Sequence, residues 1–228
     1  MAYDAVVFDM DGVLVERTPQ WVFDETAEET LSAFDITDPM GYEYRAIRHL
    51  EGTPDRALEH FDAEYGIDFE EVWQHRDEVL ASKQATAVQR NEKNLYDDAR
   101  RVDDIPVPTG VVSNNLQPAV ETVLNSYDLA DSFDTVYGLS TRLSEYDYRK
   151  PNPTYLEAAL RDLDADSAVY VGDRASDVKA ARRAGIDGAF VRRPFNDDEV
   201  FPPASPRFAA DSLGELLDDL EPHLAQAE

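Results

Sequence analysis

Two carboxylates separated by a single residue follow the first apolar run of the chain. Residues 6–8 (VVF) lead directly into Asp9 and Asp11, and Gly12 comes next. Such a run is typical of a buried strand, and open α/β sheets bind their ligands at the carboxyl ends of strands. Two like charges held this close repel each other unless a cation or a shared proton offsets the repulsion. An acidic turn is the plainer interpretation, because Asp and Gly are ordinary turn residues.

Three further groups of reactive side chains each follow a predicted core strand. Ser113, Asn114 and Asn115 place a hydroxyl and free amides ahead of a helix, an arrangement that cradles anions. Lys150, one of only four lysines, lies between a strand and a helix. Asp173 and Asp177 stand at a strand end and one helical turn later, a spacing that suits a Mg²⁺ site with oxygen ligands. Taken singly, these groups also fit a turn, a solvated lysine and a helix N-cap.

The four groups are stronger evidence together than singly, because the carboxyl ends of parallel strands meet at one edge of a sheet. Several carboxylates, one ammonium and one hydroxyl would then share a small space. Carboxylates alone would not tolerate such crowding, whereas a divalent cation and a bound phosphoryl group would balance the charges. The sequence therefore predicts a phosphoryl-transfer site with Mg²⁺ at this edge.

Two kinds of periodicity indicate the elements that must position these groups. Helical apolar patterns fill the stretch after the first strand, with Thr18 as a predicted N-cap and Pro19 as the first helical residue. The predicted helices there cover about 21–34, 41–50, 54–61 and 69–80, and another begins near Asn91. Strands then alternate with helices, which is typical of a parallel sheet. The predicted strands are 109–113, 135–138, 167–172, 188–191 and 207–210; the helices are 118–124, 153–163, 176–184 and 213–224, and a Pro-rich loop spans 194–206.

This order predicts an α/β fold with a Rossmann-like parallel sheet flanked by helices and an inserted all-α domain. We expect the core domain to comprise residues 1–16 and 104–228, with the first strand central in its sheet. The helical domain would comprise residues 17–103.

The composition excludes several classes of function. The net charge of −27 and the pI of about 4.3 argue against nucleic acids and anionic membranes as partners. The chain has no cysteine, so disulfides and thiolate metal sites are excluded. No membrane span or leader pattern stands out, and we expect a cytoplasmic protein. The acidic, lysine-poor composition is typical of halophiles, so we expect the fold to loosen at low ionic strength, which circular dichroism across a salt series would test.

The four groups together resemble the motifs of the haloacid dehalogenase-like hydrolase superfamily. Asp9-Met10-Asp11-Gly12-Val13-Leu14-Val15 is similar to its first motif, Ser113 to its second, Lys150 to its third, and Gly172-Asp173-Arg174-Ala175-Ser176-Asp177 to its fourth. The order and the placement after strands agree as well. The helical stretch resembles the α-helical cap that this family carries between its first two motifs.

The resemblance implies a role for each matching carboxylate. Asp9 would be the nucleophile that forms an aspartyl-phosphate. Asp11 would protonate the leaving alcohol and then accept a proton from the hydrolytic water. Mg²⁺ would be held by the carboxylates of Asp9 and Asp173 and by the backbone carbonyl of Asp11.

It also implies roles around the phosphoryl group. Ser113 would hydrogen-bond a phosphoryl oxygen, Lys150 would neutralise its charge, and Asn114 completes the predicted anion cradle. Asp177 would orient Lys150 or a metal-bound water.

The presence of an acid at position 11 distinguishes the phosphatase branch of this family from the dehalogenase branch. The dehalogenase branch has no acid at this position, because a halide leaves without a proton. We therefore predict a Mg²⁺-dependent phosphatase that hydrolyses a small phosphorylated metabolite. A β-phosphoglucomutase-like phosphotransferase would retain both acids and stays an alternative, as does a non-catalytic binding or regulatory protein with this fold.

Substrate choice is expected to lie with basic residues near the motifs. Arg45, Arg48 and His49 belong to the predicted helical domain, and Arg17 follows the first motif. These side chains are candidates for contacting a carboxylate or a second phosphate of the substrate. The plainer interpretation is that they are surface residues, and in so acidic a chain many arginines simply pair with neighbours.

Overall fold

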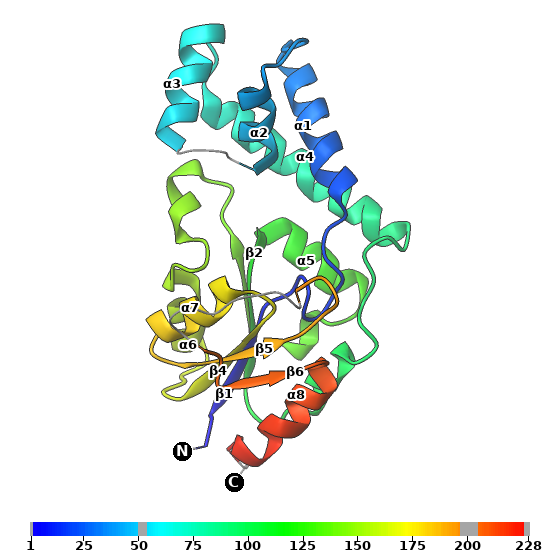
Figure 1. Cartoon of the computed structure of the whole chain (residues 1–228), viewed down its shortest axis with the longest axis vertical. Helices are drawn as coiled ribbons and strands as arrows, with labels where there is room; N and C mark the ends of the chain where they lie inside the picture. Colours follow the sequence, from blue (N-terminus) through cyan, green and yellow to red (C-terminus); the bar gives the residue numbers. More distant parts are fainter. Residues whose placement is uncertain (1, 50–53, 197–204, 226–228) are drawn as a thin grey trace.

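A six-stranded parallel sheet forms the centre of the protein. The computed structural model describes residues 2–49, 54–196 and 205–225 (Figure 1). The strands are β1 (Ala5–Phe8), β2 (Thr109–Leu116), β3 (Thr135–Leu139), β4 (Ala168–Gly172), β5 (Asp187–Val191) and β6 (Phe208–Ala210). Their order is β3-β2-β1-β4-β5-β6, and every neighbouring pair is parallel. The predicted α/β class and the inner position of the first strand are confirmed.

Helices cover both faces of this sheet. They are α5 (Gln117–Ser126), α6 (Thr154–Asp162), α7 (Ala175–Arg183) and α8 (Leu213–Leu220), with short 3₁₀ helices η1 (Ala99–Asp104), η2 (Ala130–Ser132), η3 (Leu143–Tyr148) and η4 (Glu221–His223). Alternate strand residues point to opposite faces. Val6 and Phe8 of β1 accordingly pack in the cluster that contains α5 and α8, whereas Ala5 and Val7 pack in the cluster that contains α6 and α7. All four are fully buried, so β1 anchors the site from the middle of the core.

Four helices separate β1 from β2 and form the helical insert. They are α1 (Gln20–Ala33), α2 (Gly41–His49), α3 (Pro54–Tyr65) and α4 (Phe69–Gln89). Figure 1 shows them at the end of the molecule opposite both termini, beyond the carboxyl ends of the strands. The insert has its own apolar core, which includes Leu31, Ile47, Phe61, Phe69 and Trp73. The division of the chain at residues 16/17 and 103/104 stays a prediction.

The chain enters and leaves the insert through two paired segments, residues 14–16 and 94–96, which we call the stem. Val15 and Leu95 form an antiparallel bridge. Two backbone hydrogen bonds of 2.8 and 3.0 Å flank this bridge. The stem therefore fixes both ends of the insert beside the first motif.

Two local predictions near the insert are wrong. No helix begins near Asn91: this residue has a φ of 56° and ends α4, because the left-handed conformation cannot continue a helix. Helix α1 begins at Gln20, and the Thr18 hydroxyl does not cap it. The Thr18 hydroxyl instead donates to Gln84 Oε1 and accepts from Lys93 Nζ, so it is not available to cap the helix.

Strand β2 extends further than predicted and runs through Leu116. Asn114 therefore continues a strand and does not open a turn. The predicted end of the second helix at residues 50–53 and most of the Pro-rich loop, residues 197–204, lie outside the described residues. Within the described ranges, no helix combines the length and the apolar character needed to cross a membrane.

Candidate active site

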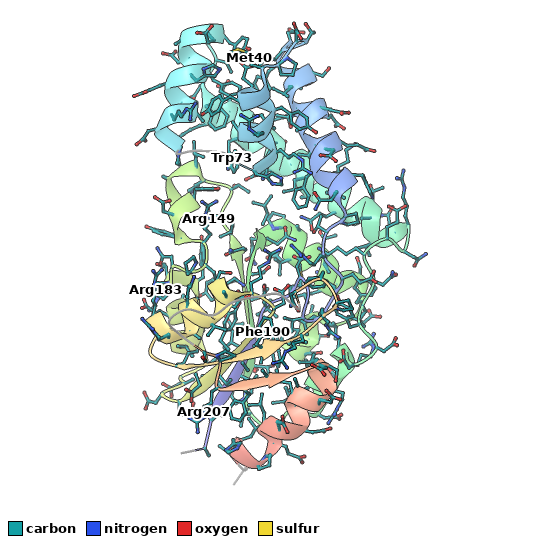
Figure 2. All side chains as sticks on the ribbon, in the orientation of Figure 1. Met40, Trp73, Arg149, Arg183, Phe190 and Arg207 are labelled. Carbon is teal, nitrogen blue, oxygen red and sulfur yellow. The ribbon has the colours of Figure 1, made fainter. Side chains whose placement is uncertain are left out.

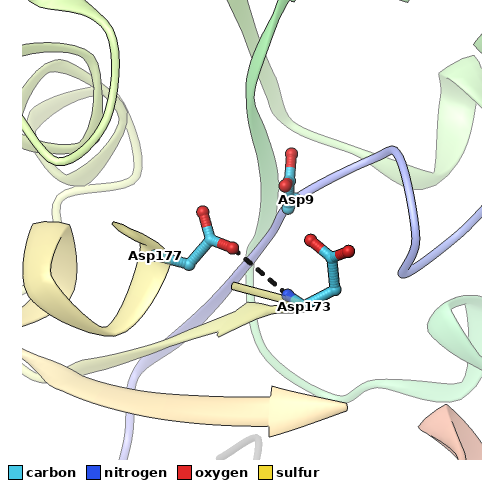
Figure 3. A group of neighbouring side chains, drawn as sticks. All are labelled: Asp9, Asp173 and Asp177. Atoms are coloured by element: carbon cyan, nitrogen blue, oxygen red, sulfur yellow. Dashed lines mark hydrogen bonds between the residues drawn. The ribbon is translucent and has the colours of Figure 1, made fainter. Parts of the chain in front are cut away.

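Three buried carboxylates meet at the carboxyl ends of the central strands (Figure 3). Asp9 follows β1, Asp173 follows β4, and Asp177 lies in the first turn of α7. One oxygen from each lies within 4.8 Å of the others. Parallel strands and a helix start thus bring together three acids that are up to 168 positions apart in the sequence.

This cluster is chemically suited to a divalent cation. Both carboxylate oxygens of Asp173 are buried without a hydrogen-bond partner among the described residues. Burial and the charge of Asp9 raise the pKa of Asp173 to about 9. Burial also raises the pKa of Asp9 to about 6, although Lys150 opposes this shift. Because hard oxygen donors are what Mg²⁺ prefers, a bound ion would satisfy these oxygens and favour their charged forms.

Lys150 provides the fixed positive charge of the cluster. Its Nζ lies 2.9 Å from Asp9 Oδ1 and 2.9 Å from Asp177 Oδ1. It also donates to the hydroxyl of Tyr170 (2.6 Å) and to the carbonyl of Val112 (3.2 Å). Burial alone would lower the pKa of Lys150, but the charges of Asp177 and Asp9 outweigh it and raise that pKa well above its usual value. The ammonium is therefore held in place from several sides.

Two glycines allow the carboxylates to approach this closely. Gly12 has a φ of +84°, and a Cβ at this position would lie 2.3 Å from Oδ2 of Asp173. A Cβ on Gly172 would lie 2.3 Å from the Cβ of Asp177. The close approach leaves Asp177 Oδ2 free to accept hydrogen bonds from the amides of Asp173 (3.2 Å) and Arg174 (2.9 Å). These bonds fix Asp177 so that its other oxygen faces Lys150.

The second predicted motif contributes more than its hydroxyl. Ser113 is buried in the site, and its Oγ accepts a hydrogen bond from the amide of Asn115 (3.1 Å). The side chain of Asn114 exchanges hydrogen bonds with the backbone of Lys150, donating to its carbonyl (3.2 Å) and accepting from its amide (2.8 Å). Asn114 thus holds the loop that carries Lys150, and its contact with phosphate stays a prediction.

Asp11 lies in a separate set of contacts beside the cluster. Its Oδ1 forms an ion pair with Lys93, and its Oδ2 accepts from Asn115 Nδ2 (2.9 Å). Sequence reasoning missed Lys93 and Tyr170, and it assigned Asn115 to the anion cradle with Ser113 and Asn114, not to a contact with Asp11. The scarcity of lysine was the one available signal, and it applied to Lys93 as much as to Lys150.

A cavity of about 690 Å³ opens between the rim of the sheet and the helical insert. Asp9, Asp11, Ser113 and Lys150 line its floor, and Trp73 lines its far wall. Figure 2 shows Trp73 at the edge of the insert that faces Arg149 of the core. Six arginines line this cavity: Arg17, Arg48, Arg76, Arg142, Arg149 and Arg174. Together with Lys150 they are seven of the 21 basic side chains of a chain whose net charge is −27.

Three of the four predicted specificity residues lie at this cavity. Arg17, Arg48 and His49 line it, whereas Arg45 is absent from its wall in the described chain. Burial and the neighbouring Arg48 lower the pKa of His49, which favours a neutral imidazole at this position. Arg76, missed from the sequence, supports α2 by donating to the carbonyl of Ile47 (3.0 Å).

Comparisons with known proteins agree with this architecture. Residues 3–185 match the haloacid dehalogenase-like hydrolase family. The phosphoglycolate phosphatase of Escherichia coli K12 is 25% identical over 224 residues, which covers 95% of this chain and 77% of that protein. The pyrophosphatase PpaX of Anoxybacillus flavithermus is 25% identical and covers 95% of this chain and 96% of its own.

Solved structures show the same fold. CbbY from Rhodobacter sphaeroides in complex with phosphate superposes with a TM-score of 0.69 at 22% identity, over 96% of this chain and 99% of that chain. A mutant of the same protein in complex with xylulose-(1,5)bisphosphate gives a TM-score of 0.67 at 21% identity, over 94% and 96% of the two chains. This chain belongs to the haloacid dehalogenase-like hydrolase family, and the prediction that it is a hydrolytic enzyme is confirmed.

Proposed function

We propose that this hydrolase is a Mg²⁺-dependent phosphatase that cleaves a small phosphorylated metabolite through an aspartyl-phosphate. One observation carries the proposal. The carboxylate of Asp9 lies 2.9 Å from the buried ammonium of Lys150, beside the carboxylate of Asp173, whose oxygens have no hydrogen-bond partner among the described residues. A carboxylate that attacks a phosphate faces repulsion between anions, and this surrounding positive charge is what reduces it.

The first half-reaction transfers the phosphoryl group to Asp9. An oxygen of Asp9 forms a bond to phosphorus while the ester P–O bond breaks. The leaving oxygen takes its proton from Asp11, which lines the same cavity. Covalent catalysis of this kind divides one difficult displacement into two easier ones.

The second half-reaction releases phosphate. Asp11, now ionised, takes a proton from water as the water oxygen bonds to phosphorus. The bond between phosphorus and Asp9 breaks, and Asp9 returns as a carboxylate. Ser113 and Lys150 contact the phosphoryl oxygens in both halves, while Asp177 keeps Lys150 in position.

The carboxylates of Asp9 and Asp173 and the backbone carbonyl of Asp11 would hold Mg²⁺. Bound there, the ion neutralises charge on the phosphoryl group and on the acidic cluster. The unpartnered oxygens of Asp173 support this assignment.

The helical insert serves as a cap in this proposal, with residues 17–103 as the cap domain on a core of residues 1–16 and 104–228. It supplies one wall of the cavity and excludes water when it closes over the substrate. The insert also brings Arg48 and His49 to the cavity, where they select among substrates.

The lining of the cavity supports a substrate with a second anionic group. Arg17 stacks on Phe195 (4.8 Å to the ring centroid) and Arg149 stacks on Tyr146 (3.6 Å). Neither guanidinium forms an ion pair with a carboxylate in the described part of the chain. Phosphoglycolate and xylulose bisphosphate, named for relatives of this protein, both carry such a second group.

A panel of phosphorylated metabolites at molar salt with Mg²⁺ tests the proposal through release of inorganic phosphate. We expect esters with a second phosphate or a carboxylate to give a higher kcat/KM than matched neutral esters. A mutase would show transfer between sugar positions with little phosphate released, and a binding protein would show no turnover. Either result would overturn the assignment as a phosphatase.

A further inference from the structure

Four polar side chains surround the carboxylate of Asp11, and we call them the Asp11 network. Lys93 pairs with Oδ1, and Asn115 Nδ2 donates to Oδ2 at 2.9 Å. Gln84 Oε1 accepts from Lys93 Nζ (3.0 Å) and from Asn115 Nδ2 (2.7 Å). Thr18 completes the network, since its Oγ1 accepts from Lys93 Nζ at 2.9 Å. Both oxygens of Asp11 are thus held by donors.

Lys93 is the centre of this network, and it is fully buried. An ammonium carries three protons, and burying it is costly unless each proton has an acceptor. Lys93 Nζ has three acceptors: Asp11 Oδ1, Thr18 Oγ1 and Gln84 Oε1. Because all three are used, the position of the ammonium is fixed, and so is the oxygen of Asp11 that it contacts.

The members of the network come from both parts of the molecule. Asn115 belongs to β2 of the core, and Gln84 belongs to α4 of the helical insert. Lys93 directly precedes the stem, and Thr18 lies between the stem and α1. The orientation of Asp11 therefore depends on residues that the core alone does not supply.

We propose that Lys93 is a positioning residue that holds Asp11 as the base for the second half-reaction. This inference rests on the proposed phosphatase function. The contacts of Asp11 in this network are donors, so they hold the carboxylate that Asp11 becomes once it has given its proton to the leaving group. Asp11 then takes the proton of the attacking water while the bond between phosphorus and Asp9 breaks. Gln84 and Thr18 make this orientation depend on the helical insert as well.

The variant Lys93→Met separates the two half-reactions when the substrate is 2,4-dinitrophenyl phosphate. Dinitrophenolate leaves without a proton, so formation of the aspartyl-phosphate does not need Asp11. Hydrolysis of the intermediate does need it, and misplacing a catalytic group costs on the order of 10²-fold in rate. We expect kcat and KM to fall together by about 10²-fold, with kcat/KM within about 3-fold of the wild type. Rapid mixing should show a burst of dinitrophenolate.

The fall in KM distinguishes positioning from damage to the fold. A smaller folded fraction lowers the apparent kcat and leaves KM unchanged. Lys83→Met is the matched control, because Lys83 pairs with Glu25 and Glu29 at the surface of the insert. That variant should keep the wild-type values of both constants. A Lys93→Met enzyme with lower kcat at unchanged KM, or with unchanged kinetics, would overturn the inference.

Two milder variants keep the inference testable if Lys93→Met does not fold. Thr18→Val and Gln84→Met each remove one acceptor of Lys93, and we expect the same joint fall of kcat and KM by about 3-fold to 10-fold. Unchanged KM in both would contradict the inference. A wild-type enzyme that releases no phosphate from any ester would instead contradict the proposed function.

Discussion

The helical insert and the rim of the sheet each bury a carboxylate, but they treat it differently. In the insert, Glu43 accepts hydrogen bonds from the amide of Met40 (2.6 Å) and the hydroxyl of Tyr65 (2.6 Å), and its Oε1 lies 2.8 Å from His60 Nε2. At the rim, both oxygens of Asp173 lack a partner among the described residues. Buried polar groups in folded proteins are nearly always hydrogen-bonded, so the unsatisfied carboxylate is the one that needs an explanation.

The pKa values of the two carboxylates shift in opposite directions. Burial alone would raise the pKa of Glu43, but the hydrogen bonds from Tyr65, His60 and Met40 outweigh it, and the net shift is downward. Burial dominates at Asp173 and raises its pKa to about 9. The same fold supplies hydrogen-bond donors to Glu43 and none to the oxygens of Asp173 among the described residues. Those oxygens face the place where a cation and a phosphoryl group are expected to bind. The comparison teaches that the supply of hydrogen-bond donors, more than burial itself, distinguishes Asp173 from Glu43.

The largest expected effect is on the rate of phosphate ester hydrolysis at the rim of the sheet. Asp9→Asn removes the proposed nucleophile and should lower kcat by at least about 10⁴-fold, as loss of a covalent nucleophile does elsewhere. The free energy of unfolding should not decrease, because the substitution removes charge from a crowded anionic cluster. Phosphate release and urea unfolding measure the two quantities. Asp97→Asn, at an exposed acid, is the control, and wild-type activity in Asp9→Asn would contradict the nucleophile assignment.

Truncating the two compared carboxylates should affect stability differently. Glu43→Ala leaves His60 and Tyr65 without their buried partner and should lower the free energy of unfolding by about 3–5 kcal/mol. Asp173→Ala removes a carboxyl group whose oxygens have no hydrogen-bond partner among the described residues, and it should change the free energy of unfolding by less than about 1 kcal/mol in metal-free buffer. Denaturant unfolding of both variants measures this. Equal losses would show that the two carboxylates do not differ in the way the geometry indicates.

Asp77 of the insert is intermediate between Glu43 and Asp173, because only one of its oxygens has a partner among the described residues. The effect of Asp77 on stability should depend on pH. Its Oδ1 pairs with Arg76 at 2.7 Å, but its Oδ2 has no partner in the described chain. Burial raises the pKa of Asp77 to about 6, against the opposing effect of Arg76. The folded state therefore binds the proton more tightly than the unfolded state, and the carboxylate costs stability as the pH rises from about 4 to 6. Over this window the free energy of unfolding of the wild type should fall by up to about 3 kcal/mol relative to that of Asp77→Asn.

Unfolding free energies of both proteins between pH 4 and 7 measure this loss, because other titrating groups cancel in the difference. A difference that does not change with pH would contradict the raised pKa. Activity toward a small aryl phosphate should stay close to wild type in Asp77→Asn, since Asp77 is absent from the cavity wall in the described chain.

Metal addition should give the smallest of these effects. Mg²⁺ at about 100 times its Kd should stabilise the wild type by about 2.7 kcal/mol relative to EDTA, through preferential binding to the folded state. Asp173→Ala should show little of this gain, while Glu43→Ala should show all of it. Thermal unfolding with and without Mg²⁺ measures the shifts. An equal rise in Tm for the wild type and Asp173→Ala would place the ion elsewhere.

The sequence was sufficient to predict the sheet and the four motif groups because both follow from local patterns. Apolar runs predict strands, and the residue after a strand must lie at the sheet edge. Asp9 and Asp173 therefore came together as the topology requires. Lys150 comes after β3 and η3, and Asn114 of β2 holds its backbone beside them. Long-range neighbours have no such local pattern. Lys93 reaches Asp11 across 82 positions, and Tyr170 lies under Lys150 only because β4 is next to β1.

The wrong predictions have the same physical origin. Thr18 has the sequence context of an N-cap, yet its hydroxyl bonds Gln84 and Lys93, which only the folded insert brings near. Asn114 has the composition of a turn, yet it pairs with the backbone of Lys150 and continues its strand. Local propensity is a weak preference that tertiary contacts override.

The stem makes the insert an exchangeable unit. Because the chain leaves and rejoins the core through one short antiparallel pairing at Val15 and Leu95, everything between can be replaced without altering the register of the sheet. Evolution can then vary which metabolites are accepted by changing the residues beyond this junction, provided that Thr18, Gln84 and Lys93 still hold Asp11. A chimaera joined at the stem that keeps these three residues would inherit its selectivity from one parent and its reaction from the other.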